Sequence, residues 1–448
     1  MTREQPFRAS SPSSTTRREI LALTAAAAGA TLLAANSASA AERFPTPQKG
    51  RVRAAPKAGE PVKIGVIGVG DSGNTPAMGY AHCERICALA KEGREKVQIV
   101  AISDVAEPYL KRAVEMCSKE QGLQVAGHKD YRELLARDDL HGVLIATPEH
   151  WHAKMAMDAI QAGLDVYLEK PMTLHVEEAL ALRAVVHAND RILQVGTQFL
   201  QHPKYHKAKE LIASGAIGKP TFSQTSYCRN SKSGEWLYKV DPAVVPGPVL
   251  DWDTWCGPNG KAAWNPEVYF RWRRFRQWST GVIGDLLVHV TTPLVFALDV
   301  GWPTRVVAVG GHFNDTAMEN HEQVNIAVEF EKGHTMTIAG STCNETGVEI
   351  LIRGHKANLY LASEHCVMRP EQAFAEEIDE QTFQSPPVPA DQDSHRLQWL
   401  ASIRSRQQPY GDVDTAAKVM VIVDLATKSL WTKSAYSFDP KSLTVARA

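Results

Sequence analysis

A short run of β-branched residues that leads directly into a glycine-rich loop constrains the fold of this chain more than any other feature. The run, residues 62–67, has the length and composition of a fully buried strand. The loop that follows is Gly68-Val69-Gly70-Asp71-Ser72-Gly73. In such a loop the first glycine permits a tight turn, the second lets the backbone approach a pyrophosphate, and the third lets helix and strand pack closely. The loop therefore predicts a dinucleotide-binding unit, although glycines alone would only mark a turn.

The sequence after this loop provides the context that such a unit needs. Residues 77–94 are compatible with a helix, whose N-terminus would offer N–H donors and a positive dipole end to the phosphates. A second buried strand, residues 97–102, is followed by Ser103 and Asp104. A carboxylate there can accept hydrogen bonds from the adenosine ribose, and it can equally cap the next helix. No arginine follows at once to neutralise a 2′-phosphate, so the sequence favours NAD, with NADP as the alternative.

Alternating strands and helices continue through residues 62–195. We expect strands at 142–146, 165–168 and 192–195, and helices at 106–121, 130–137, 150–162 and 175–189. This alternation predicts an α/β domain with a doubly wound, parallel Rossmann sheet. Ligands bind beyond the carboxyl ends of the strands in such sheets, where this sequence places Thr147, Glu169 and Lys170.

The rest of the chain, residues 196–448, has a different pattern. Strand-like segments separated by turns occupy residues 221–227, 305–310, 323–331, 334–341, 348–353 and 357–361. Helices are expected at 205–214, 391–406 and 413–431. These segments predict a second, α+β domain with an open, mostly antiparallel sheet.

A loop-rich stretch, residues 229–278, holds six of the ten tryptophans. These aromatic rings could stack on sugar rings with neighbouring arginines as hydrogen-bond donors, and Trp272 and Arg273 are the candidate substrate residues. The structural alternative is that large aromatic side chains hold together a long excursion with little regular structure.

Asp285 and His289 are four residues apart in a stretch that we expect to be helical, residues 281–289. At this spacing both side chains lie on one face, so the carboxylate could orient the imidazole and raise its basicity for general acid–base catalysis. The alternative is a buried histidine that is hydrogen-bonded by its neighbour.

The first forty residues are typical of an export signal. Paired arginines, Arg17 and Arg18, precede an alanine-rich apolar stretch at 20–35, and Ala38-Ser39-Ala40 offers a cleavage site. The alternative, a membrane anchor, would need ~20 strongly apolar residues. We therefore expect a twin-arginine-type signal peptide at 1–40, export to the periplasm and no stable membrane insertion of the mature chain. Prolines and glycines predict a solvated linker at 41–61.

Charge and cysteine content exclude two classes of partner. The chain has 49 basic and 50 acidic residues, so it lacks the basic excess that binding to nucleic acid requires. Its seven cysteines include no C-x-x-C pair, which argues against a zinc site or a disulfide framework. We therefore expect no metal.

Taken together, these motifs resemble those of the glucose–fructose oxidoreductase / inositol dehydrogenase / rhizopine catabolism (Gfo/Idh/MocA) superfamily, over about residues 62–435. The family's nucleotide loop matches the glycine loop, and its ribose-binding acid corresponds to Asp104. Its T-P-x-x-x-H segment corresponds to Thr147, Pro148 and His152, and its E-K-P segment to Glu169, Lys170 and Pro171. Its D-x-x-x-H segment corresponds to Asp285 and His289, and its polar nicotinamide contact to Gln198.

The resemblance implies an NAD(P)-dependent enzyme that transfers hydride from a sugar or polyol hydroxyl in carbohydrate metabolism. Lys170 would stand near the reacting carbinol, and His289, oriented by Asp285, would exchange the hydroxyl proton. Which of the two is the base stays open. The family often pairs through its open sheet, which implies a homodimer or homotetramer.

Export raises the question of how such an enzyme keeps its cofactor. One answer is a tightly bound nucleotide that is regenerated within each catalytic cycle. A related alternative is a redox-neutral reaction, in which a transient keto-sugar permits glycoside cleavage or epimerisation. A third hypothesis is a non-catalytic sugar-binding protein, against which Lys170 and His289 argue.

Overall fold

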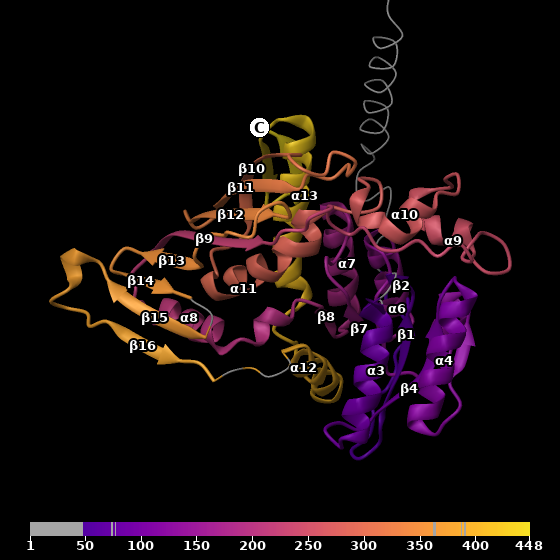
Figure 1. The fold of residues 1–448 in the computed structure, drawn as a ribbon. Coiled ribbons are helices and arrows are strands. Elements are labelled where there is room, and N and C mark those ends of the chain that lie inside the picture. Colours follow the sequence, from indigo (N-terminus) through magenta and orange to yellow (C-terminus); the bar gives the residue numbers. More distant parts are fainter. Residues whose placement is uncertain (1–47, 73–74, 77, 362–363, 387, 389–390) are drawn as a thin grey trace, which may run out of the picture. The chain divides into compact units, whose positions relative to one another are not determined.

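The computed structural model describes residues 48–448 except 73–74, 77, 362–363, 387 and 389–390 (Figure 1). The predicted signal peptide, the start of the predicted linker and Gly73 lie outside the described residues.

The first sheet has six parallel strands in the order β5-β4-β1-β6-β7-β8. Its strands are β1 (Val62–Ile67), β4 (Val97–Ser103), β5 (Ala126–His128), β6 (Gly142–Ile145), β7 (Asp165–Leu168) and β8 (Leu193–Val195). The connecting helices are α3 (Met78–Lys91), α4 (Glu107–Gln121), α5 (Tyr131–Leu135), α6 (Glu149–Gln161) and α7 (Val176–Asn189). The predicted doubly wound parallel sheet is confirmed; only the short strand β5 was not predicted.

Helix α12 (Asp391–Ser405) packs against this first sheet although it lies near the C-terminus. Its residues Trp399, Leu400 and Ile403 are fully buried in the same apolar cluster as Val62 and Ile64 of β1. The sequence predicts one continuous second domain at residues 196–448. In the structure the chain returns to complete the first core, because β1, β6 and β7 leave apolar side chains that α12 covers.

The described part of the predicted linker, residues 48–61, is mostly exposed, but a few contacts attach it to the first domain. The backbone N–H of Arg51 donates to Gln161 O at 2.8 Å. The guanidinium of Arg53 donates to carbonyl oxygens at the ends of two helices, Ala162 at 2.7 Å and Leu135 at 3.0 Å. Carbonyl groups at helix ends lack partners within the helix, so a nearby arginine can satisfy several of them.

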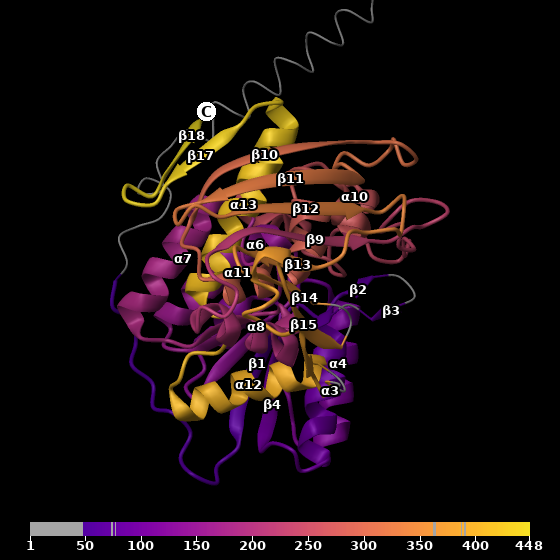
Figure 2. The same cartoon turned by 90° about the vertical axis from the view of Figure 1, so that its left-hand side faces the viewer.

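The second sheet has ten strands in the order β16-β15-β14-β13-β9-β12-β11-β10-β17-β18. All its neighbouring pairs are antiparallel except β12 with β9, so the predicted open, mostly antiparallel sheet is confirmed. Its central strands are β9 (Pro220–Cys228), β10 (Pro303–Gly311), β11 (Gln323–Phe330) and β12 (Thr335–Ser341), which lie side by side in Figure 2. The outer strands are β13 (Leu351–Gly354), β14 (Ala357–Tyr360), β15 (His365–Pro370), β16 (Gln381–Gln384), β17 (Tyr436–Asp439) and β18 (Thr444–Arg447).

One face of this sheet is covered by helices. Along β11, Val324, Ile326 and Val328 are each 1% exposed while the residues between them face outward. The helices that pack against the sheet are α8 (Pro203–Ala213), α11 (Val288–Leu298) and α13 (Val413–Thr432), and the short helices α9 (Trp252–Cys256) and α10 (Pro266–Arg271) lie in the tryptophan-rich stretch. The four strands β15 to β18 were not predicted, because they are short and mostly polar or exposed. No helix in the described part of the chain combines the length and apolarity needed to cross a membrane.

Candidate active site

A cavity lies at the carboxyl ends of the parallel strands, where the sequence predicted a ligand. Its wall on the first domain includes residues that follow four different strands, namely Gly68, Gly70, Asp104, Thr147, Pro148, Glu169 and Lys170. The opposite wall comes from the tryptophan-rich stretch and includes Trp255, Tyr269, Phe270, Trp272 and Arg273. The structure therefore brings together most of the predicted cofactor residues and both candidate substrate residues.

Gly68 meets the requirement for a tight turn that the sequence assigned to the first glycine. Its φ angle is +87°, and a Cβ atom there would lie 2.9 Å from the backbone of Ala146 and from the Thr147 side chain. After Gly68 the backbone N–H of Val69 donates to Oδ2 of Asp104 at 2.7 Å. The backbone at Gly68 therefore lines the cavity in a conformation that a residue with a side chain could adopt only with strain.

The close helix–strand contact expected of the third glycine is made by Gly79. The chain forms a small hairpin, β2 (Asp71–Ser72) with β3 (Thr75–Pro76), before α3 begins at Met78. A Cβ on Gly79 would overlap the carbonyl oxygen of Gly68. Sequence reasoning missed Gly79 because the hairpin lengthens the loop; a glycine in the first turn of the next helix was the available signal.

Asp104 links the glycine loop to the start of α4. Oδ1 accepts from the Ala106 N–H at 2.8 Å and Oδ2 from the Val69 N–H. The cap position of α4 is Ala106, so Asp104 is not the N-cap residue itself. Burial raises the pKa of Asp104 to about 6, although the backbone donors oppose this. The carboxylate lines the cavity and has lone pairs left to accept hydroxyl groups.

These features fit a dinucleotide. Gly68 leaves room that a Cβ would fill, Asp104 offers an acceptor, and the buried hydroxyl of Thr147 has no hydrogen-bond partner within the described residues. Pro148 precedes α6 with extended backbone, so the first turn of that helix follows directly at the cavity wall.

His152 does not line the cavity, in contrast to the expectation that it contacts the cofactor. The ring is completely buried, with Nδ1 2.6 Å from Pro171 O and Nε2 2.8 Å from Thr147 O. It therefore ties the turn after β6 to the residue after Lys170 and positions both. Gln198 lies in η1 (Gln198–Gln201) and is likewise not among the described residues that line the cavity.

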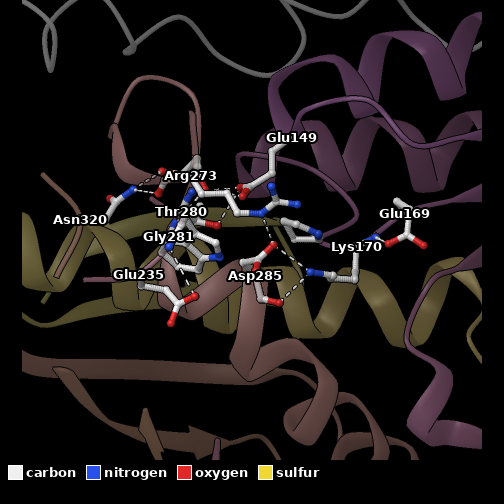
Figure 3. A network of polar contacts seen from close by, with 12 residues as sticks. Glu149, Glu169, Lys170, Glu235, Arg273, Thr280, Gly281, Asp285 and Asn320 are labelled. Atoms are coloured by element: carbon white, nitrogen blue, oxygen red, sulfur yellow. Dashed lines mark hydrogen bonds and ion pairs between the residues drawn. The ribbon is translucent and has the colours of Figure 1, made fainter. Parts of the chain in front are cut away.

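Lys170, Asp285 and Arg273 form an ionic group between the two domains (Figure 3). Nζ of Lys170 lies 2.8 Å from Oδ1 of Asp285 and 2.9 Å from its main-chain oxygen. Nε of Arg273 lies 2.8 Å from the same Oδ1. Burial alone would raise the pKa of Asp285, but the Arg273 and Lys170 cations hold this pKa well below its usual range. Asp285 is therefore a permanent anion.

The expected Asp285–His289 arrangement is altered by the local backbone. Asp285 lies in a π-helical turn, η4 (Ile283–Leu287), and His289 lies in the first turn of α11. The sequence predicts that Asp285 orients His289, whereas in the structure the carboxylate of Asp285 is joined to Lys170 and Arg273. The His289 ring lies 5.4 Å from the Phe199 ring and 6.3 Å from the Tyr227 ring, measured between centroids. π-Helical turns are frequent at functional sites because they redirect side chains.

Glu149, which the sequence did not single out, anchors the chain before this turn. It is completely buried and accepts hydrogen bonds from Thr280 N and Oγ1, both at 2.9 Å, and from Ser279 Oγ. Asn320 donates to Arg273 O at 3.0 Å from the other side (Figure 3). These contacts fix the segment that presents Asp285 and Arg273.

The tryptophans divide between the two interpretations. Trp252, Trp255 and Trp278 are at most 6% exposed and pack on one another, with ring centroids 4.7 Å apart for Trp252–Trp255. Trp252 and Trp278 support the structural interpretation, whereas Trp255 belongs to this cluster and also lines the cavity. Trp272 lines the cavity too, with the Arg273 guanidinium 4.2 Å from its ring centroid.

Fold and site together define a two-domain dinucleotide-binding protein with an ionic group at its domain junction. Residues 62–197 match the family described as "Oxidoreductase family, NAD-binding Rossmann fold", and residues 249–437 match its "C-terminal alpha/beta domain". The chain therefore belongs to the Gfo/Idh/MocA oxidoreductase family, and its first domain is an NAD-binding Rossmann domain.

Curated relatives cover part of the chain. An α-N-acetylgalactosaminidase of Shewanella oneidensis is 30% identical over 224 residues, which are 46% of this chain and 45% of that protein. A glycosyl hydrolase family 109 protein of Shewanella baltica is 31% identical over 228 residues, 46% of each chain. The chain thus spans just under half the length of the curated relatives it matches.

Solved structures share the fold over most of the chain. Levoglucosan dehydrogenase in complex with NADH has a TM-score of 0.63 at 19% identity and covers 84% of this chain and 98% of its own. An oxidoreductase domain protein from Kribbella flavida also has a TM-score of 0.63, at 18% identity, with the same coverage.

Proposed function

We propose that this protein is an NAD(P)-dependent oxidoreductase that acts on a hydroxyl group of a sugar or polyol, with NAD as its cofactor and NADP as the alternative. The observation that carries this proposal is the position of Lys170. Its ammonium group lies in the wall of the same cavity as the glycine loop and Asp104, and it is held there by Asp285.

We propose that the proton chemistry is divided between two residues, Lys170 and His289. When bound, the nicotinamide supplies the acceptor for the hydride that leaves the substrate carbon. An ammonium group has three hydrogens, and Lys170 gives two of them to the oxygens of Asp285. The third can be donated to the substrate oxygen, which would stabilise the negative charge as the hydroxyl proton leaves. His289 is then the candidate proton acceptor.

We further propose that the cofactor is held tightly, because a segment of the second domain is attached to both sides of the cavity mouth. On the β4 side, the Glu107 N–H donates to Val249 O at 2.9 Å and the Asp251 N–H donates to Val105 O at 3.0 Å. These contacts lie directly after Asp104.

On the β6 side, the same segment is attached to α6. The carbonyl oxygen of Trp255 lies 2.7 Å from His150 Nε2 and accepts from Trp151 Nε1 at 3.0 Å. A nucleotide in the cavity would lie beneath the stretch between these two attachments, so its release would require contacts on at least one side to break.

A second candidate function is redox-neutral cleavage of a glycoside or epimerisation through a transient keto-sugar. The observation that favours it is the name of the relative at 30% identity, an α-N-acetylgalactosaminidase. Such a reaction would use the same cavity and would return the hydride within one cycle, with no net change in cofactor. A third candidate, a non-catalytic sugar-binding protein, would need neither Lys170 nor His289.

One experiment separates the three candidates. The purified protein is incubated with NAD and a panel of sugars and polyols, and separately with aryl α-N-acetylgalactosaminides. Net formation of reduced nicotinamide supports the main proposal, and aryl release without it supports the second candidate. Sugar binding with neither reaction, unchanged in Lys170→Ala, would support the third.

We propose in addition that the chain is exported to the periplasm by a twin-arginine-type signal peptide at residues 1–40, and that it forms a homodimer or homotetramer. The paired Arg17 and Arg18 support export, and the exposed residues that alternate with buried ones along β11 give the sheet an outward face that could pair. Retention of an Arg17→Lys, Arg18→Lys double variant in the cytoplasm, with the wild type in the periplasm, would test export. Light scattering would test the oligomer.

A further inference from the structure

A buried line of polar side chains connects helix α12 to the cavity wall. Nε of Arg396, which is 2% exposed, donates to Nδ1 of His82 in α3 at 2.8 Å. His82 is 1% exposed, and its Nε2 lies 2.8 Å from Oε1 of Glu169. Glu169 lines the cavity beside Lys170. Arg396, which is 314 positions from His82 in the sequence, is thus connected to Glu169 by one imidazole ring.

The direction of these hydrogen bonds fixes the tautomer of His82. A guanidinium can only donate, so the Nδ1 atom that faces Arg396 must carry a lone pair. The single ring hydrogen is then on Nε2 and is donated to Glu169. If the ring were protonated, its Nδ1–H would face the Nε–H of Arg396 in a buried place. Burial lowers the pKa of His82, and the neighbouring Arg396 cation lowers it further against the influence of Glu169.

Arg396 is itself held in position. Its NH1 lies 3.2 Å from Oδ1 of Asp393, which is also buried and also pairs with Arg85 at 2.7 Å and Arg94 at 3.2 Å. The guanidinium therefore has a counter-charge on one side while its Nε points to His82. Loss of Arg396 would leave Asp393 still neutralised by two arginines.

Glu169 fits closely in its place. A Cβ at Gly196, after β8, would lie 2.9 Å from Oε1 of Glu169, so only glycine leaves room for the carboxylate. The Lys170 N–H donates to its other oxygen at 3.2 Å. The charged or titratable groups that face Glu169 are His82 from α3, Lys170, His152 from α6, His289 from α11 and His395 from α12.

The charge of Glu169 completes a balance around the two cations Lys170 and Arg273, which line the cavity with it. Asp285, which pairs with both cations, and Glu169 are the two anions of this group. If Glu169 took up a proton, this group would be left with one net positive charge. The oxidised nicotinamide is a cation and the reduced form is neutral, so the extra charge would disfavour the oxidised form alone.

We propose that Arg396 and His82 are positioning residues that keep Glu169 ionised and oriented, and that this carboxylate adapts the cavity to the oxidised, cationic cofactor. The inference rests on the proposed NAD-dependent function. The hydrogen bond from His82, with the positive groups around it, lowers the pKa of Glu169 to about 2 although burial on its own would raise this pKa. Without His82 as donor, less opposes the effect of burial, so the pKa of Glu169 rises.

The test compares the dissociation constants of NAD⁺ and NADH between pH 5 and 8, followed by quenching of tryptophan emission in protein from which nucleotide has been removed with charcoal. The ratio of the two constants is the readout, because protonation of Asp104 affects the adenosine end of both forms alike. His82→Leu removes the donor. His82→Gln keeps one donor and one acceptor in nearly the same places, and Arg404→Gln changes an arginine of α12 that pairs with Glu95 outside this line.

In the wild type, His82→Gln and Arg404→Gln, we expect the same ratio and the same pH profile. In His82→Leu the dissociation constant of NAD⁺, divided by that of NADH, should rise by about tenfold at the acid end of the pH range. One uncompensated charge near the nicotinamide predicts a change of this size. Arg396→Met should give a smaller rise, because the imidazole can then take its other tautomer. A wild-type profile in both His82→Leu and Arg396→Met would overturn the proposal, and if one variant does not fold the other decides.

The ¹⁵N shifts of the imidazole provide a readout that needs neither nucleotide nor substrate. We expect His82 to be the Nε2–H tautomer from pH 5 to 8 in the wild type and a tautomer mixture in Arg396→Met. A protonated His82, or a mixture in the wild type, would overturn the positioning role even if the enzyme turns over. A fixed tautomer in a protein that oxidises no sugar would instead count against the proposed function alone.

Discussion

Lys170 and Asp285 are 115 positions apart in the sequence, yet Nζ of Lys170 lies 2.8 Å from Oδ1 and 2.9 Å from the main-chain oxygen of Asp285. Lys170 follows β7 of the first domain, and Asp285 lies in the π-helical turn of the second. The two domains therefore meet at the group that is proposed to polarise the substrate. This relationship makes the catalytic geometry depend on how the domains pack.

Asp285→Asn should lower kcat by roughly 10²–10³-fold while nucleotide affinity changes little. The amide keeps the shape of the side chain but loses the charge that holds the Lys170 ammonium and the Arg273 guanidinium together. Steady-state kinetics on the best substrate is the measurement. Asp253→Asn, which breaks an exposed pair with Lys261, is the matched control. A variant within twofold of wild type would contradict the role of Asp285.

Nucleotide affinity should fall as the pH drops through about 6, equally for NAD⁺ and NADH. Asp104, whose pKa burial raises to about 6, must be ionised to accept from the ribose hydroxyls, so protonation below this pH weakens binding. Titration by tryptophan fluorescence at a series of pH values would show this. Asp104→Asn should bind weakly at every pH and lose the dependence; an unchanged pH profile in that variant would show that another group is responsible.

Gly79→Ala should destabilise the protein by about 2–3 kcal/mol, because the added methyl group would overlap the carbonyl of Gly68 in a close-packed region. It should also weaken nucleotide binding, since the turn at Gly68 must move. Chemical denaturation and nucleotide titration measure the two effects. Glu84→Ala, on the exposed side of the same helix, is the control and should change neither. Equal stability of the two variants would contradict the close contact proposed between Gly79 and the turn at Gly68.

Trp151→Phe should speed the release of bound nucleotide by up to about tenfold, since one hydrogen bond contributes about 0.5–1.5 kcal/mol. The indole N–H holds the Trp255 carbonyl at 3.0 Å, which is one of the attachments across the cavity mouth. Exchange of bound nucleotide against labelled NAD gives the rate. Trp302→Phe, beside Phe438 in the second domain, is the control. Equal exchange rates in both variants would contradict the proposed closure.

The cavity residues of the first domain could be predicted because local pattern determines where buried strands end. Gly68, Asp104 and Lys170 follow three apolar runs, and parallel topology places the ends of such runs at one edge of the sheet. The pattern of strands and helices also predicted the fold of both domains, and the structure confirms it. Asp285 was singled out by its spacing from His289 and by the family motif, neither of which predicted its partners Lys170 and Arg273.

Partners that depend on packing between distant segments could not be predicted. Arg396 reaches His82 only because α12 returns to the first core, and Arg53 contacts helix ends only after α5 and α6 have packed. Neither arrangement has a periodicity or motif in the sequence. The π-helical turn at Asp285 is another case, since the local sequence is compatible with an ordinary α-helix.

The most direct test of the central claim is to identify the nucleotide that the purified protein carries and to follow its reduction by sugars and polyols in a single turnover. We predict NAD(H) bound to the chain, reduced by at least one sugar or polyol in the wild type and by none in Lys170→Ala, which should still bind the nucleotide. A wild-type protein with no nucleotide and no affinity for one, or a Lys170→Ala variant that is reduced at the wild-type rate, would contradict the account.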